Sequence, residues 1–357
     1  MVKTLTDKEL PELIKKDCIS SSEELEEYIQ PASIDIPLGN KAYHLQQKFI
    51  PFSNEIHAVA EKLCIEKIDL NKGTNLYKGQ TYLIKCLDIN LPQHLSGVIS
   101  PKSSIGRIDL RVRSIVDNHY LYDTIEPGKK GELWLEVTPR SFNVKVKKGI
   151  PLAQLRIIDE NEDSTIDFSK QPLVIEEDGT RKVGTMYRGR LVLSLNVEPG
   201  KIIGYEAKST DEIIDLSKKG ALNPKKFFRE LVADSRPESR LTGKFVLEKD
   251  RFYILSTKEL VAVPEDYSLE MVSIDPKLGD LTVHYAGFFD PGFGMKKGAN
   301  GVLEVRPHEV TTVYHGQPIC LMECFENKSA PTNSYGASGN NYQYQRGPRL
   351  SKYFKQD

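Results

Sequence analysis

The sequence predicts a mainly β protein made of two tandem copies of one β domain, with short helices at its N-terminus. Three observations carry this prediction. Short apolar segments alternate with turn signals along most of the chain, and two long stretches resemble each other. The chain also has 357 residues, 39% of them hydrophobic and 28% charged, which suffices for two domains with apolar cores.

The N-terminal stretch "TDKELPELI" predicts a short helix that Thr6 or Asp7 caps. Its apolar face would consist of Leu10, Leu13 and Ile14. A second short helix is expected in "SSEELEEYI", which follows directly.

Beyond these helices the chain becomes rich in predicted strands. The segments "QTYLIKCLDINL", "GELWLEVTP", "FNVKVKKG" and "PLAQLRII" alternate or run apolar, and turn signals such as Glu126-Pro127-Gly128 separate them. Strands this short, at this spacing, indicate a sandwich or a jelly roll. An acidic and polar stretch over about 159–189 is typical of a connector, and a second β-rich region begins at "RLVLSLNVEPG".

The two β-rich regions can be aligned with each other. The alignment pairs Tyr82 with Tyr253, Pro92 with Pro264, Leu-Glu-Val at 135–137 with Leu-Glu-Val at 303–305, and Gly149 with Gly316. The offset is far longer than a solenoid repeat, so it indicates duplication of a whole domain. We therefore expect a first domain over 1–165, a connector over 166–190, a second domain over 191–330 and a C-terminal tail over 331–357.

The copies differ in their polar elements. The first copy has "PKSSIGR" where the second has "PKLGD", so Ser103, Ser104 and Arg107 have no counterparts. The second copy has the glycine- and aromatic-rich "HYAGFFDPGFG" where the first has "DTIEPGKKG". This pattern predicts a site assembled from two complementary halves.

Composition argues against several classes of function. The net charge is −1, from 49 basic and 50 acidic residues, which does not favour a nucleic-acid partner. No apolar run is long enough to span a membrane, and the charged N-terminus does not resemble a signal peptide, so we expect a cytoplasmic protein. The five cysteines lack zinc-site spacing, so no protein-bound metal is expected.

Four motifs carry a resemblance to a known family. They are "QPASIDIPLG" (30–39), "KSSIGR" (102–107), "AGFFDPGFG…GVLEV" (286–305) and "YQYQRGPRLSK" (342–352). In this order they resemble the dCTP deaminases of the dUTPase-like superfamily, in particular the long form with a duplicated β domain. The resemblance covers essentially the whole chain.

The resemblance implies a distorted β jelly roll, or β-clip, in each domain and homo-oligomers, typically trimers, with active sites between β domains. It implies hydrolytic deamination of dCTP to dUTP and ammonia, in the supply of dUTP and dTTP precursors. Inhibition by dTTP is left open. The resemblance further implies that no metal takes part in the base chemistry and that Mg²⁺ accompanies the triphosphate.

The resemblance also implies roles for individual residues. Glu304 corresponds to the catalytic glutamate, and Ser103 and Arg107 lie beside the base and the catalytic water. The expected substrate contacts are Lys102 and Ser104 at the triphosphate, Ala286 through its backbone at the base, Asp290 at the deoxyribose, and Tyr335, Tyr342, Gln345 and Arg346 in a tail that covers the phosphates.

The sequence departs from the family pattern at three places. A basic residue is usual where Asn341 stands, and an arginine is common where Pro37 stands, so the first motif is interpreted as structural. The segment from Asp290 to Glu304 is longer than its counterpart in the first copy, which lengthens the hairpin.

The chemistry of deamination favours one carboxylate over its duplicate. Replacing the C4 amino group of cytosine needs an activated water and proton delivery to N3 and to the leaving ammonia, and one carboxylate can shuttle these protons. The chain lacks the PCxxC signature of zinc deaminases. Glu304 is favoured over Glu136 because a small residue, Ala286, precedes it in the hairpin, whereas the bulky Tyr122 holds that place in the first copy.

Two features have open interpretations. Phe289 and its aromatic neighbours can form core or can pack on a deoxyribose, because pocket walls and cores have the same composition. The tail can be a loose terminus or a lid that orders on the triphosphate, to which Arg346, Arg349 and Lys352 would supply charge.

Two rival functions stay open. One is a dUTP diphosphatase, or a bifunctional enzyme that makes dUMP from dCTP, with Asp290 activating water at the α-phosphate. The other is a non-catalytic regulator that binds deoxynucleotides on the same fold.

Overall fold

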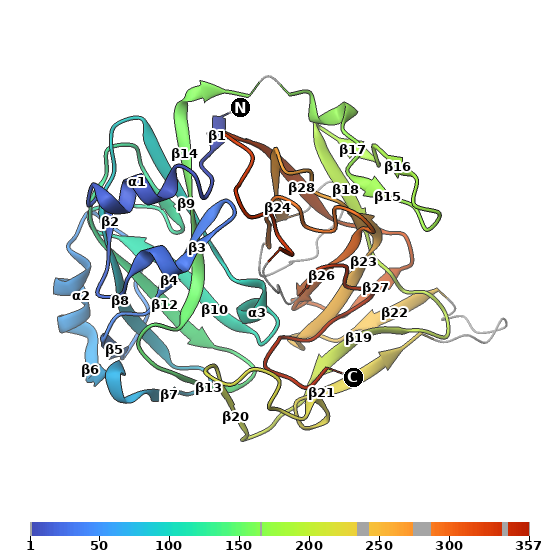
Figure 1. The fold of residues 1–357 in the computed structure, drawn as a ribbon. Helices are drawn as coiled ribbons and strands as arrows, with labels where there is room; N and C mark the ends of the chain where they lie inside the picture. Colours follow the sequence, from blue (N-terminus) through green and yellow to red (C-terminus); the bar gives the residue numbers. More distant parts are fainter. Residues whose placement is uncertain (1, 165, 234–242, 274–286, 338–341, 357) are drawn as a thin grey trace.

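The computed structural model describes residues 2–164, 166–233, 243–273, 287–337 and 342–356. Strands make up most of its regular structure and the helices are short (Figure 1). The predicted mainly β class is therefore confirmed. Within the described part of the chain, no helix combines the length and the apolar character needed to cross a bilayer.

The elements of the first half follow one another along the chain; η marks a 3₁₀ helix. They are β1 (Val2–Thr4), α1 (Leu10–Lys15), β2 (Ile19–Ser20), η1 (Leu25–Tyr28), β3 (Ile29–Gln30), β4 (Ser33–Pro37), β5 (Lys41–Leu45), α2 (Ile56–Leu63), β6 (Cys64–Asp69), η2 (Leu70–Lys72), β7 (Thr74–Leu76), β8 (Thr81–Asn90), β9 (Leu95–Pro101), α3 (Ser103–Gly106), β10 (Leu110–Val116), β11 (Thr124–Ile125), β12 (Lys130–Pro139), β13 (Asn143–Val146) and β14 (Pro151–Asp163).

The second half contains a similar run of strands. They and their helical turns are η3 (Phe168–Lys170), β15 (Val174–Ile175), β16 (Arg181–Lys182), β17 (Met186–Tyr187), β18 (Arg190–Ser194), β19 (Ile202–Ala207), β20 (Ile213–Asp215), η4 (Pro224–Lys226), β21 (Phe228–Val232), β22 (Lys244–Leu247), β23 (Tyr253–Val261), β24 (Tyr267–Ser273), β25 (Phe288–Phe289), β26 (Ala299–Val305), β27 (Thr311–Tyr314) and β28 (Pro318–Asn327). The predicted connector region thus includes the short strands β15 to β17.

The pairing of strands repeats between the halves, which confirms the duplication. β8 pairs with β12 as β23 pairs with β26. β14 pairs with β9 and β4 as β28 pairs with β24 and β18. In each half the Leu-Glu-Val strand lies against the aligned tyrosine: Val137 is opposite Tyr82, and Val305 is opposite Tyr253. Glu136 and Glu304 therefore occupy equivalent positions in their sheets.

The two halves are joined by strands as well as by packing. β1 is antiparallel to β14 of the first half and parallel to β28 of the second, within an 11-stranded sheet (Figure 1). β13 pairs in parallel with β20. A shared core continues beneath, where Phe142 contacts Phe227 and Phe228, and both of these contact Phe354 near the C-terminus. The halves therefore form one continuous structure.

The N-terminal helices differ in detail from their predictions. α1 begins at Leu10, with Glu9 rather than Thr6 or Asp7 at the cap position. The backbone N–H and the hydroxyl of Thr6 instead donate to the Glu9 carboxylate, each over 2.9 Å. The second predicted helix is a single 3₁₀ turn with only Leu25 buried, because the chain enters β3 directly afterwards.

Candidate active site

A cavity of about 320 Å³ lies between the two halves of the chain. Its lining residues are Gln30, Asp35, Pro101, Lys102, Ser103, Ser104, Arg107, Gln154, Lys219, Gly287, Phe288, Phe289, Asp290, Phe293, Val302, Glu304, Tyr335, Tyr342, Gln345 and Lys352. Most of the site residues predicted from the sequence are among them. Ala286 lies outside the described residues, and Arg346 is placed elsewhere.

Arg346 supports the hairpin from outside the cavity. Its guanidinium donates to the backbone carbonyls of Gly298 and Lys297 over 2.7 and 2.8 Å. These carbonyls immediately precede β26. In this structure Arg346 therefore holds the strand that carries Glu304, where the sequence had indicated a substrate contact.

The "KSSIGR" motif forms the one-turn helix α3, which faces the strands of the second half (Figure 1). Ile105 is fully buried and anchors the turn in the core. The backbone N–H of Arg107 donates to the Ser103 carbonyl over 3.1 Å, so the two side chains stand one helical turn apart on the cavity side. The helix thus presents a hydroxyl and a guanidinium to the cavity.

Arg107 is the most heavily contacted cation of the site. The residue is 3% exposed, and its guanidinium donates to Gln345 Oε1 and to the Arg349 carbonyl, both over 3.1 Å. It lies 3.8 Å from the centre of the Tyr342 ring. Arg107 Nε lies 3.9 Å from Glu304 Oε1, beyond hydrogen-bond range but close enough for strong attraction in a buried site.

Glu304 reaches the cavity from β26, a strand that is buried on both faces. Its neighbours Leu303 and Val305 point into the second-half core, so strand alternation directs Glu304 to the opposite side. Burial raises the pKa of Glu304 to about 8, against the opposing effect of Arg107. A carboxyl group with this pKa can both accept and donate a proton near neutral pH.

Asp290 is a second buried carboxyl group in the same cavity. Burial raises its pKa to about 7, with Lys102 acting in the opposite direction. Among the described residues, none forms a hydrogen bond with Asp290 Oδ1, which is buried. This oxygen is therefore available to a bound molecule.

The hairpin around Asp290 forms one wall of the cavity opposite α3. A Cβ atom built on Gly287 would lie 3.8 Å from Ser103 Oγ, which shows how closely the hairpin backbone approaches the helix. Phe289 and Phe293 contact each other edge to face at 4.9 Å. Both belong to the second-half core and both line the cavity, so the core interpretation is confirmed and contact with a deoxyribose stays a prediction.

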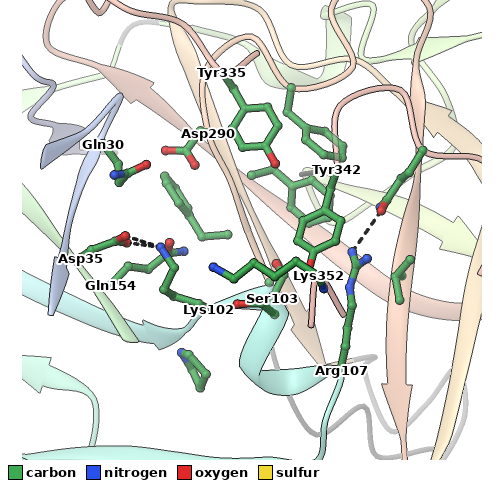
Figure 2. A pocket seen from close by; sticks show the side chains of 18 of the residues that line it. Gln30, Asp35, Lys102, Ser103, Arg107, Gln154, Asp290, Tyr335, Tyr342 and Lys352 are labelled. Atoms are coloured by element: carbon green, nitrogen blue, oxygen red, sulfur yellow. Dashed lines mark hydrogen bonds and ion pairs between the residues drawn. The ribbon is translucent and has the colours of Figure 1, made fainter. Parts of the chain in front are cut away.

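Cations gather on the side of the cavity where Asp35 lies (Figure 2). Lys102 forms an ion pair with Asp35 of β4, and Lys219 and Lys352 line the same cavity. Figure 2 shows Lys352 extending toward Lys102. Burial and, after it, the positive charges of Lys102 and Lys219 lower the pKa of Lys352 to about 8. Lys102, Lys219 and Lys352 thus bring three ammonium groups to one cavity, which suits a polyanion.

The C-terminal tail closes over α3. Ser351 Oγ donates to the Ser104 carbonyl over 2.7 Å, and the backbone N–H of Lys352 donates to the Tyr342 hydroxyl over 3.0 Å. Gln345 Nε2 donates to the Asn300 carbonyl of β26 over 2.7 Å. The tail therefore contacts both halves of the site. Asn341, where the sequence departs from the family pattern, lies outside the described residues.

Sequence reasoning missed several lining residues. Asp35 and Gln30 belong to the motif that was interpreted as structural, and Gln154 and Lys219 belong to no motif. A signal existed for Asp35: an acidic residue within the apolar strand "SIDIP" is rarely buried without a partner. Nothing in the sequence marks Lys219, because the fold alone brings it to the cavity.

The equivalent place in the first copy is filled by its own side chains. Glu136 is 1% exposed, and Lys48 Nζ lies 3.7 Å from its Oε1. The Tyr122 hydroxyl donates to the Phe49 carbonyl over 2.9 Å, and Arg113 stacks on the Tyr122 ring at 4.4 Å. Burial raises the pKa of Glu136, and the positive charge of Lys48 acts in the opposite direction. None of these residues lines the cavity described above.

Comparison with known proteins gives a consistent picture. Residues 2–161 match the family model of the 2'-deoxycytidine 5'-triphosphate deaminase N-terminal domain, and residues 161–354 match that of the C-terminal domain. A crystal structure of 2'-deoxycytidine 5'-triphosphate deaminase from Agrobacterium tumefaciens superimposes with a TM-score of 0.82. It is 32% identical, and the match covers 92% of this chain and 99% of that one.

Curated relatives match over shorter segments. A "dCTP deaminase, dUMP-forming" from Thermobifida fusca is 36% identical over 118 residues, which cover 31% of this chain and 57% of the relative. One from Leifsonia xyli is 36% identical over 135 residues, covering 36% of this chain and 60% of the relative. The chain thus spans less than two thirds of the length of these relatives.

The raised pKa of Glu304 predicts how stability depends on pH. The folded protein holds this proton up to about pH 8, whereas an unfolded chain releases it near 4.5. The contribution of Glu304 to stability should therefore fall as pH rises from about 4.5 to about 8. We expect Glu304→Gln to lose less stability than the wild type over this range, which thermal melts at pH 5 and pH 8 would measure.

Glu309→Gln, at an exposed position, is the control and should follow the wild type. An equal pH dependence of melting in Glu304→Gln and the wild type would contradict the raised pKa.

Proposed function

Because this chain belongs to the dCTP deaminase family, we propose that it hydrolyses dCTP at C4 of the cytosine and releases ammonia. One observation carries the proposal: a buried glutamate that can titrate near neutral pH lies beside a buried arginine in a cavity of nucleotide size. The printed names of the Agrobacterium structure and of the curated relatives support the same reaction.

In the proposed reaction Glu304 moves the protons. It accepts a proton from a water molecule as the water oxygen bonds to C4, and passes a proton to N3. It then takes the proton of the new C4 hydroxyl and delivers it to N4, so that the C4–N4 bond breaks, ammonia leaves and the C4 carbonyl of the uracil forms. Arg107 and Ser103 would orient the water and stabilise the charge that develops.

The charges of the cavity support one orientation of the substrate. We propose that the base lies near Glu304 and Arg107, that the deoxyribose lies against Asp290 and Phe289, and that the triphosphate points toward the lysines. Lys219 and Lys352 would then bind the phosphates in place of the basic residue that the family usually has where Asn341 stands. The substrate would be the Mg²⁺ complex of dCTP, with the metal carried on phosphate oxygens. Contact of the base with the Ala286 backbone stays a prediction.

The identity of the final product is a finer question. The sequence favoured dUTP, with dUMP as the alternative; the curated relatives, named dUMP-forming, favour the alternative. Asp290 offers a physical basis for it, since a buried carboxylate with an unpartnered oxygen could activate water toward the α-phosphate and release pyrophosphate. Homo-oligomers, trimers among them, and a cytoplasmic location stay predictions, and inhibition by dTTP stays open.

Product analysis tests the proposal directly. The protein is incubated with dCTP and Mg²⁺, and nucleotides, ammonia and pyrophosphate are measured. We expect one ammonia per dCTP, and one pyrophosphate where dUMP is the product. Ammonia with dUTP but without pyrophosphate would show that dUTP is not hydrolysed further to dUMP. Saturable dCTP binding without any ammonia would instead support the regulator.

The two copies of Leu-Glu-Val offer a matched pair of variants. Glu304→Gln should lower kcat at least about 100-fold, because general acid–base catalysis by the carboxylate is lost. Glu136→Gln removes a carboxylate of similar burial from outside the cavity and should retain turnover. Steady-state ammonia release measures both. A larger loss in Glu136→Gln would reverse the assignment of the copies.

Lys352 should make substrate affinity depend on pH. Its pKa of about 8 means that it loses its charge as pH rises from 7 to 9, so KM for dCTP should rise over this range. Lys352→Arg keeps the charge and should show a flatter KM. Lys352→Gln should raise KM at pH 7 about tenfold, the effect of one charge-assisted hydrogen bond.

Lys355→Gln changes an exposed lysine of the same tail and is the control. If KM rises equally with pH in the wild type and in Lys352→Arg, Lys352 does not bind the phosphates.

A further inference from the structure

A second ion pair joins the two halves directly beside Arg107 and Glu304. The Arg306 guanidinium binds the Asp109 carboxylate, and both side chains are almost completely buried. Asp109 lies two residues after Arg107, and Arg306 lies two residues after Glu304. The same pair of chain segments is therefore linked twice, with the charges reversed in the second link.

Asp109 is held firmly on the first-half side. It occupies the turn between α3 and β10 with a left-handed backbone (φ 53°), which aspartate tolerates better than most residues. Its Oδ2 accepts from Ser141 Oγ over 2.5 Å, and its carbonyl accepts from the Arg140 backbone over 3.0 Å. Its carboxylate is thus oriented toward the second half.

Arg306 is held equally firmly on the second-half side. It follows the end of β26, and Nη1 donates to the Asp250 carbonyl. Nη2 binds Asp109 and also donates to Ser141 Oγ over 3.0 Å. One planar guanidinium therefore connects the backbone at Asp250 with Asp109 and Ser141 of the first half. A lysine cannot reproduce this geometry.

The catalytic segments belong to separate sheets. β10, which follows α3, pairs with β12, whereas β26 pairs with β23. Contacts between α3 and β26 are therefore made through side chains. Around these elements Arg107 lies 3.9 Å from Glu304, whereas Arg306 and Asp109 are hydrogen-bonded. The shorter, fully hydrogen-bonded link is the one able to set the distance of the longer one.

We propose that Asp109 and Arg306 form a positioning pair that holds Arg107 at its working distance from Glu304 across the two halves of the chain. The inference rests on the proposed function and deepens it. A buried ion pair contributes little to stability compared with apolar packing, so its value here lies in geometry. Displacements of about 1 Å in a catalytic group can lower turnover about 100-fold.

The test uses the full chain with dCTP and measures kcat, KM and the pH profile. Asp109→Asn keeps the shape and tolerates the left-handed turn. The double variant Asp109→Asn with Arg306→Gln leaves no lone buried charge, so it should fold. We expect both to lower kcat about 10- to 100-fold with little change in KM, as for residues that orient functional groups. Displacing Arg107 should also raise the pKa of Glu304, because Arg107 lowers it. The limb of the kcat–pH profile that reports Glu304 should then move to higher pH.

Asp159→Asn is the matched control. Asp159 is buried and pairs with Lys328 of the other half over 2.7 Å, away from the cavity. It should keep kcat and the pH profile while losing some thermal stability. A wild type that releases no ammonia would refute the proposed function. With an active wild type, an unchanged kcat and pH limb in both Asp109 variants, or equal losses in Asp159→Asn, would overturn the positioning role.

Discussion

The structure depends on one constraint: the buried guanidinium of Arg107 needs partners from two other parts of the chain, β26 and the C-terminal tail. Glu304 supplies the negative charge, Gln345 and the Arg349 carbonyl accept its hydrogen bonds, and Tyr342 covers its face. A buried cation without such partners would be costly. The two β domains and the tail must therefore meet at this point, and the cavity forms where they do.

Duplication made this arrangement possible within a single chain. The two copies retain the same strand pairing, down to the tyrosine opposite each Leu-Glu-Val segment. Their polar groups have diverged. The first copy contributes Arg107, which follows α3, and the second contributes Glu304 of β26. In the first copy, Glu136 instead pairs with Lys48, and the Tyr122 hydroxyl donates to the Phe49 carbonyl. One composite site thus takes groups from both copies.

The electrostatics of the cavity combine two kinds of group. Burial raises the pKa values of Glu304 and Asp290 into the range where a carboxyl group can exchange protons near neutral pH. Lys102, Lys219 and Lys352 line the same cavity, and Lys102 forms an ion pair with Asp35. A local cluster of cations thus exists although the whole chain carries a net charge of only −1.

The sequence by itself determined the β class, the duplication and the division of polar motifs between the copies, because strand periodicity, turns and motif residues are local. It also pointed to Ser103, Arg107, Asp290 and Glu304, which line the cavity. Only the tertiary structure brought Asp35 and Lys219 to the cavity and turned Arg346 away from it, since these placements depend on how distant segments pack. The same holds for the raised pKa of Glu304, because burial is a property of the folded chain and not of its order of residues.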